Sequence, residues 1–196
     1  MPNLVRRRVS VLDLGFEDAK KLKEIAKKKQ HAKKKFLGVE WVKQEKFNTR
    51  FHNLKLTYGD TLSKLRRLPS GSVNVITADF FFSEFKVNGR EISDHSSLRK
   101  KLSDKYQKRK IDTLKEVKRV PPPNGRFFVI EYGLDLEKTS NLLNQNGFVC
   151  TKKSIPKSQM HRTEFLSLIA DRMIVDARHA PDWQPYVITA RKKSTA

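Results

Sequence analysis

Short apolar runs along this chain alternate with longer segments whose apolar residues recur every three or four positions. This is the pattern of strands alternating with helices. Residues 9–14 form a first apolar run that stops at Gly15, and residues 16–29 carry an amphipathic stripe made of Leu22, Ile25 and Ala26. Residues 36–39 form a second run that ends on Glu40. We therefore expect a strand–helix–strand unit whose two strands lie parallel.

The rest of the chain continues this alternation in one domain. Further strands are expected at residues 54–58, 73–78, 126–131, 148–152 and 186–190, and helices at residues 62–68, 96–120 and 136–145. Residues 43–52 are polar with a possible short helix, residues 86–90 read as a loop around Asn88-Gly89, and residues 155–185 read as an insertion. The pattern predicts an α/β fold.

Acidic residues follow several of the predicted strands. Because ligands of such sheets bind outside the carboxyl ends of the strands, Gly15, Glu40 and Asp60 are expected at one binding edge. Glu40 lies where a carboxylate accepts hydrogen bonds from both ribose hydroxyls of a nucleoside, although a surface glutamate that merely ends a strand fits as well. Asp60 suits either an adenine amino group or the N-cap of the next helix.

The fourth predicted strand runs into an acid followed by three aromatic residues, Asp79-Phe80-Phe81-Phe82. Some of these rings belong in a core. One or two of them suit a pocket in which a flat base stacks, an interaction of about 1–3 kcal/mol per base. Asp79 is expected where a carboxylate meets the reacting group.

The charge of the chain points to a polyanionic partner. Forty-two Lys and Arg against 21 Asp and Glu give the 196-residue chain a formal net charge of +21. Nucleic acid is the default partner of such a protein, and an acidic membrane surface is the second choice. The expected helix at residues 96–120 carries ten Lys and Arg, and we interpret it as a phosphate-contacting face, with a solvated helix face as the alternative.

Other features narrow the class of protein. The single cysteine, Cys150, excludes an internal disulfide and a cysteine-rich metal site, and its strand-like neighbours favour a buried structural thiol. No stretch approaches the roughly 20 apolar residues of a membrane span, and residues 1–8 lack the apolar segment of a signal peptide. We expect a cytoplasmic protein.

The order of these segments resembles that of the class I S-adenosylmethionine-dependent methyltransferases. The segments that carry the resemblance are VLDLG, FLGVE, LTYGD, SVNVITADF, RFFVIE, QNGFVC and YVITARK. LDLGF followed by FLGVEW is similar to the tRNA guanine-N7 methyltransferases and their archaeal relatives. The resemblance implies a Rossmann-like, doubly wound, mostly parallel seven-stranded sheet with an antiparallel last strand.

The resemblance also implies a site for S-adenosylmethionine. Its cofactor residues would be Asp13, Gly15, Phe16, Glu40, Trp41, Asp60, Thr61 and Asp79, with Asp79 and Phe80 at the reacting atoms. RNA would meet Phe81, Phe82, Glu84, Arg99, Lys100, Lys101, Lys105, Lys108 and Arg109. Two motifs depart from the family: Glu17 stands where the first turn usually has its second glycine, and the aromatic run replaces a proline-tryptophan-proline type sequence.

The leading hypothesis is therefore a methyltransferase that acts on a tRNA or rRNA base. A catalytically decayed methyltransferase fold that only binds RNA is the second, because the first turn carries two acids after Phe16. A methyltransferase with a protein or small-molecule substrate is the third. A nicotinamide-dependent oxidoreductase comes last, since the glycines of its fingerprint are missing.

Overall fold

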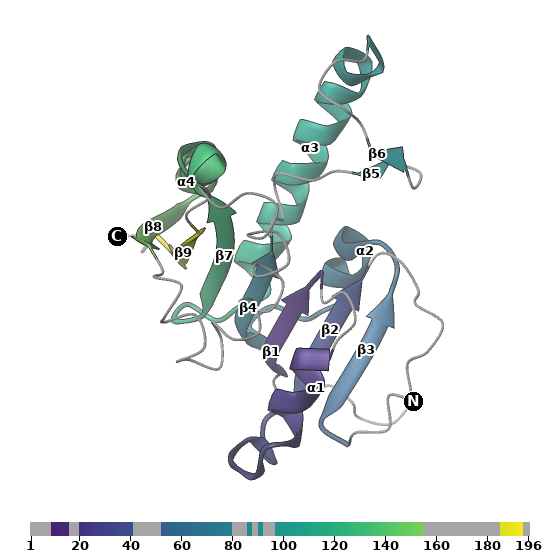
Figure 1. The fold of residues 1–196 in the computed structure, drawn as a ribbon, viewed down its shortest axis with the longest axis vertical. Helices are drawn as coiled ribbons and strands as arrows, with labels where there is room; N and C mark the ends of the chain where they lie inside the picture. The colour runs from purple at the N-terminus through teal and green to yellow at the C-terminus, as the bar shows by residue number, and fades with distance from the viewer. Residues whose placement is uncertain are drawn as a thin grey trace.

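The fold is described from a computed structural model that places residues 9–15, 20–40, 52–79, 86–87, 90–91, 97–154 and 185–193. Its elements in chain order are β1 (Val9–Leu14), α1 (Lys20–Lys27), η2 (Lys29–His31), β2 (Phe36–Glu40), β3 (Leu54–Tyr58), α2 (Thr61–Arg66), β4 (Val73–Asp79), β5 (Lys86–Val87), β6 (Arg90–Glu91), α3 (Ser97–Arg119), β7 (Arg126–Tyr132), α4 (Gly133–Gln145), β8 (Phe148–Ser154) and β9 (Pro185–Lys192). Figure 1 shows them as a ribbon.

Seven strands form one sheet in the order β3-β2-β1-β4-β7-β9-β8. The pairs from β3 to β7 are parallel, and β9 runs antiparallel to both of its neighbours, β7 and β8. The predicted seven-stranded, mostly parallel sheet with an antiparallel last strand is confirmed. Because β1 lies in the middle, with β2 on one side and β4 on the other, the strand order reverses at β1. A reversal of this kind is where open α/β sheets bind ligands.

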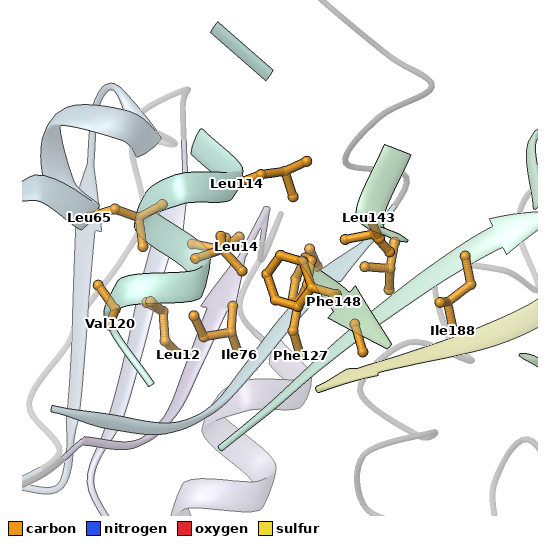
Figure 2. Packing of buried hydrophobic residues seen from close by; sticks show 14 of the residues in the cluster. Leu12, Leu14, Leu65, Ile76, Leu114, Val120, Phe127, Leu143, Phe148 and Ile188 are labelled. Carbon is orange, nitrogen blue, oxygen red and sulfur yellow. The ribbon is translucent and has the colours of Figure 1, made fainter. Parts of the chain in front are cut away.

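The main core lies on the face of the sheet that α2, α3 and α4 cover. Leu12, Ile76 and Phe127 point from neighbouring strands toward Leu65 of α2 and Leu114 of α3, and all five are at most 1% exposed (Figure 2). Side chains of a strand alternate between faces, so Val11 and Phe36 face the other side. There α1 contributes the predicted stripe, whose three residues Leu22, Ile25 and Ala26 are 0 to 3% exposed.

Several element boundaries differ from the expected ones. The first helix is shorter than predicted: α1 ends at Lys27, a turn of 3-10 helix follows, and residues 16–19 lie outside the described set. The expected loop at residues 86–90 contains a two-stranded antiparallel hairpin, in which Lys86 pairs with Glu91 and Val87 with Arg90. The helix α4 begins at Gly133, three residues earlier than predicted. The expected short helix at 43–52, except for His52, and almost all of the insertion at 155–185 lie outside the described residues.

The long helix at residues 96–120 is confirmed as α3, Ser97–Arg119. Its last turns are fixed to the sheet by Leu114, Val117 and Val120, each 0% exposed. Arg119 ties the end of the helix to α2, because its guanidinium donates to the Leu65 carbonyl at 2.9 Å and to the Ser70 hydroxyl at 3.1 Å. Among the helices that the structure describes, none is both long and apolar enough to cross a membrane.

Candidate functional site

The candidate site lies at the carboxyl ends of β1 to β4. Strand pairing places two rows of residues across these strands on the same face. Asp13, Gly38 and Leu56 are register partners in the first row, and Thr77 pairs with Asp13 from the other side. Two positions further along, Glu40 and Tyr58 are register partners at the ends of β2 and β3. The predicted edge is therefore present, with the acids of consecutive strands gathered along it.

The turn after β1 leaves open space beside the strand end. Gly15 has φ +80°, and its amide donates to the Val39 carbonyl at 2.9 Å, which holds the turn against the end of β2. A Cβ at Gly15 would meet no atom within 4 Å. The left-handed backbone and the open space together allow a ligand to approach the chain closely at this point.

Asp13 lies in β1 two residues before Gly15, and it is buried, at 2% exposed. The hydroxyl of Thr77 donates to Asp13 Oδ1 at 2.7 Å, and its contact with the Leu12 carbonyl is 3.4 Å. Thr77 itself is 0% exposed. Sequence reasoning missed Thr77, although a polar residue in the otherwise apolar stretch 75–78 was a signal for a specific partner.

Glu40 is half-buried at the end of β2, and its backbone carbonyl accepts from the amide of Gly59 at 2.8 Å. The negative charge of its carboxylate affects the hydroxyl of Tyr58, its register partner on β3. Burial, and secondarily the negative charge of Glu40, raise the pKa of the Tyr58 hydroxyl. A half-buried carboxylate in this position can accept hydrogen bonds from a ribose, as predicted for a nucleoside ligand.

Asp60 serves as the N-cap of α2, one of the two roles that the sequence left open. Its Oδ2 accepts from the amide of Ser63 at 3.0 Å and from the Ser63 hydroxyl at 2.7 Å. Its Oδ1 forms an ion pair with the guanidinium of Arg109 on α3. Thr61 is the first residue of α2, beside this cap. The Asp60 carboxylate is therefore already engaged on both oxygens.

Other predicted site residues are placed only in part. Asp79 is the last residue of β4, at the same edge as Glu40, and its side chain lies outside the described set. Phe16, Trp41, Phe80, Phe81, Phe82 and Glu84 lie outside the described residues altogether. Arg99, Lys100, Lys101 and Lys105 are in α3, where only the backbone is described. Lys108 is exposed, whereas Arg109 is half-buried and points to Asp60.

Two further predictions are refined. Cys150, expected to be buried, is half-buried beside the main core, and burial raises the pKa of its thiol while Lys152 and Lys193 act in the opposite direction. The acid that ends the strand RFFVIE, Glu131, is 0% exposed and lies opposite Tyr186 of β9. Its carboxylate therefore lies in the interior, away from the exposed part of the edge.

No protein-family profile matches this sequence, and no curated protein matches it. Solved structures do match the fold. The 16S rRNA methyltransferase KamB aligns with a TM-score of 0.61 at 14% identity over 96% of this chain and 90% of its own. The [4+2]-cyclase SpnF aligns with a TM-score of 0.57 at 14% identity over 96% of this chain and 76% of its own.

A third match is the phosphoethanolamine N-methyltransferase 2 of Haemonchus contortus, solved with S-adenosyl-L-methionine. It aligns with a TM-score of 0.55 at 9% identity over 96% of this chain, which spans 49% of that protein. These likenesses establish the fold alone: the chain has the Rossmann-like sheet architecture that these three proteins share. The three neighbours are an rRNA methyltransferase, a cyclase and a phosphoethanolamine N-methyltransferase, so the fold alone does not select a reaction.

Proposed function

We propose that this protein is an S-adenosylmethionine-dependent methyltransferase that modifies a base of tRNA or rRNA. The observation that carries the proposal is the meeting of Gly15, Glu40 and the end of β4 at the edge of the sheet where the strand order reverses. This edge is the site that open α/β sheets use for nucleoside ligands. The relation to guanine-N7 methyltransferases, the role in tRNA processing and the cytoplasmic location remain part of the proposal.

The residues at the edge fit the cofactor in two respects. Glu40 supplies a half-buried carboxylate for the ribose hydroxyls, and the open space beside Gly15 admits the methionine end of the ligand. The carboxylate of Asp13, two residues before Gly15, is held in place by the hydroxyl of Thr77. Asp60 fits less well as a partner of the adenine amino group, because its oxygens already serve Ser63 and Arg109.

S-adenosylmethionine would supply an electrophilic methyl group on a sulfonium centre. What remains for the protein is alignment of the nucleophile with that methyl group, which can account for a large part of the rate enhancement. A ring nitrogen such as guanine N7 has a free lone pair and needs no general base. Asp79 at the end of β4 and the aromatic residues 80–82 would hold the base in place; their side chains are assigned this role from the sequence.

The RNA half of the proposal rests on charge. The net charge of +21 needs a polyanionic partner, and α3 carries ten Lys and Arg among its 23 residues. The structural similarity to KamB, a 16S rRNA methyltransferase, is consistent with this choice.

A direct test of the cofactor half is calorimetric titration of the full chain with S-adenosylmethionine. We expect saturable binding, and Glu40→Gln should weaken it about tenfold, which corresponds to about 1.4 kcal/mol. Glu137→Gln, which changes an exposed carboxylate of α4, is the matched control and should bind as the wild type does. Absence of saturable binding at millimolar ligand would overturn the proposal.

The substrate half is tested by transfer of a labelled methyl group to total RNA. We expect incorporation that is lost in Glu40→Ala. Mass spectrometry of tRNA and rRNA nucleosides from cells with and without the protein would then name the modified atom. Incorporation into protein or small molecules instead of RNA would support a methyltransferase but contradict the proposed RNA substrate.

Two observations favour a second function, an RNA-binding protein that no longer transfers methyl groups. Asp60 is held by α2 and α3, and the turn after Gly15 carries Glu17 in place of the second glycine. This alternative predicts RNA affinity that does not change when the cofactor is added, together with no methyl incorporation.

A further inference from the structure

A compact lysine-rich segment joins α1 to β2 at the edge of the sheet opposite the candidate cofactor site. We call residues 27–35 the lysine loop. Six of its nine residues are lysine and none is acidic: the sequence reads KKKQHAKKK. The exposed side chains are those of Lys27, Lys28, Lys29, Gln30, Ala32, Lys33 and Lys34, and that of Lys35 is half-exposed. In Figure 1 the loop lies at the lower end of α1, at the pole away from the tips of β1 to β4.

The loop is folded around one buried side chain, that of His31. This histidine is 5% exposed, and its ring meets the ring of Phe36 edge to face, with 5.9 Å between the ring centres and an interplanar angle of 89°. The amide of His31 donates to the Lys28 carbonyl at 2.8 Å, and the amide of Lys34 donates to the His31 carbonyl at 2.9 Å. The backbone of the lysine loop is therefore fixed by its own hydrogen bonds, and the ring contact of His31 with Phe36 holds it against β2.

A second anchor is Asn53, at the start of β3 and 6% exposed. Its side-chain amide donates to the Ala26 carbonyl at 2.8 Å and to the His31 carbonyl at 3.3 Å. These bonds satisfy a carbonyl at the end of α1 and tie the loop to the neighbouring strand. A loop held in this way loses little backbone entropy when it binds a partner.

The lysine loop gathers positive charge without an acid among its own residues. Elsewhere, several described basic side chains form ion pairs with acids: Arg119 with Glu116 at 2.7 Å, Lys115 with Asp112 at 3.6 Å, and Arg109 with Asp60. The lysine loop has no acid in its own nine residues, so its six positive charges repel one another. A cluster of exposed like charges on an anchored backbone suits a polyanionic ligand.

We propose that the lysine loop contacts the phosphate backbone of RNA. Lysine ammonium groups bind phosphates as point charges and without reading bases, so this surface supplies affinity and orientation but no sequence choice. This inference rests on the proposed RNA substrate, and it adds an RNA contact remote from the site of methyl transfer. The loop precedes β2, whose five residues separate it by about 13 Å from Glu40 at the other end of the strand.

RNA fits the loop better than an anionic membrane does. Helices and loops that bind membrane surfaces insert apolar side chains beside their basic ones. Here the exposed side chains are lysines, a glutamine and an alanine, whereas the aromatic residues His31 and Phe36 are buried at 5% and 3% exposure. The phosphates of a folded RNA in solution can contact exposed lysines without any such insertion.

The test is fluorescence anisotropy of the full chain with a labelled, tRNA-sized RNA, without cofactor, over a series of salt concentrations. Neutralising Lys29, Lys33 and Lys34 together to Gln should lower the slope of log affinity against log salt by about two to three units. The same three positions changed to Arg should retain the wild-type slope. Because the test requires neither cofactor nor methyl transfer, its result is independent of whether the cofactor site works.

The matched control neutralises three exposed lysines elsewhere, Lys55, Lys138 and Lys153, with the same change of net charge. We expect a smaller effect from this control than from the lysine-loop variant. Equal effects of the two triple variants would show that only total charge matters and would overturn the proposal. So would an unchanged slope in the lysine-loop variant, or weakened binding to vesicles of phosphatidylserine and phosphatidylcholine without any change in RNA affinity.

Discussion

The guanidinium of Arg109 on α3 forms an ion pair with the carboxylate of Asp60, the residue that caps α2. The two residues are 49 positions apart in the sequence. The pair joins the start of α2 and the middle of α3 directly beside the edge where Glu40 ends β2. Asp60 therefore has a clear structural role, and Arg109 contributes to the fold as well as to the basic surface of α3.

Substitutions of Asp60 should separate its two contacts. Asp60→Asn keeps an oxygen that accepts from Ser63 but removes the charge that Arg109 meets, so it should cost well under 1 kcal/mol, since the pair is partly exposed. Asp60→Ala removes the cap as well and should cost about 1–2 kcal/mol. Urea denaturation followed by circular dichroism measures both. Equal destabilisation by the two variants would contradict the role as N-cap.

Thr77 should contribute to stability because its hydroxyl donates a hydrogen bond to the buried carboxylate of Asp13. Thr77→Val preserves the shape of the side chain but removes the hydroxyl that donates to Asp13 at 2.7 Å. Hydrogen bonds to charged groups contribute about 1.5–3 kcal/mol, so we expect a loss of that size in urea denaturation. Thr77→Ser retains the donor and should lose clearly less. A Val variant as stable as the Ser variant would show that the bond contributes nothing.

The sheet was predictable from the sequence because each central strand is an apolar run bounded by turn residues. The run that becomes β1 ends at Gly15, and the run that becomes β3 ends at Gly59, which has φ +119°. The prediction of an acid at the end of the second strand also matches the structure, in which Glu40 is the last residue of β2. Periodicity sufficed here because burial on both faces of a parallel sheet leaves a strong local signal.

Other features depend on contacts between distant segments, which periodicity does not encode. Thr77 reaches Asp13 across 64 positions, and Asn53 reaches Ala26 across 27. The role of Asp60 was left open for the same reason, because a cap and a ligand contact need the same residue type at the same place. His31 was overlooked because it sits among lysines, and only the folded loop shows its ring against Phe36.

Tyr58 should titrate above its ordinary pKa of about 10. Burial, and then the charge of Glu40, raise the pKa of this hydroxyl. The folded state therefore holds the proton to higher pH than the unfolded state does, so the contribution of Tyr58 to stability is present below about pH 10 and falls as the pH rises through the folded pKa. Absorbance titration at alkaline pH, with Tyr58→Phe as the difference, measures this value. Glu40→Gln should lower it, and an unchanged value would contradict the proximity of the two groups.

Cys150 should react slowly in the folded protein. Burial raises the pKa of its thiol, so the fraction of reactive thiolate is small at neutral pH, although Lys152 and Lys193 offset part of this shift. Alkylation with iodoacetamide at pH 8 should be slower than for a free thiol and should accelerate in urea. Lys193→Gln removes one compensating charge and should slow the reaction further. Since this is the only cysteine, mass spectrometry reads the reaction without ambiguity.

The two basic surfaces should act additively on one large RNA. Lys100, Lys101 and Lys105 lie in the first half of α3, at the pole of the molecule opposite the lysine loop (Figure 1). Their triple change to Gln should lower the salt slope by about two to three units and leave cofactor affinity unchanged, since it spares Arg109 and the contact with Asp60.

Combining this triple variant with the lysine-loop variant should lower the slope for a tRNA-sized RNA by about four to six units, because counterion release adds over independent phosphate contacts. A short hairpin that cannot span the two poles should instead bind one surface at a time, so either triple variant alone should change its slope by less than the combined variant does. If the combined variant binds the large RNA no more weakly than one triple variant, the two surfaces do not meet the same RNA molecule. The lysine loop and α3 would then serve separate partners.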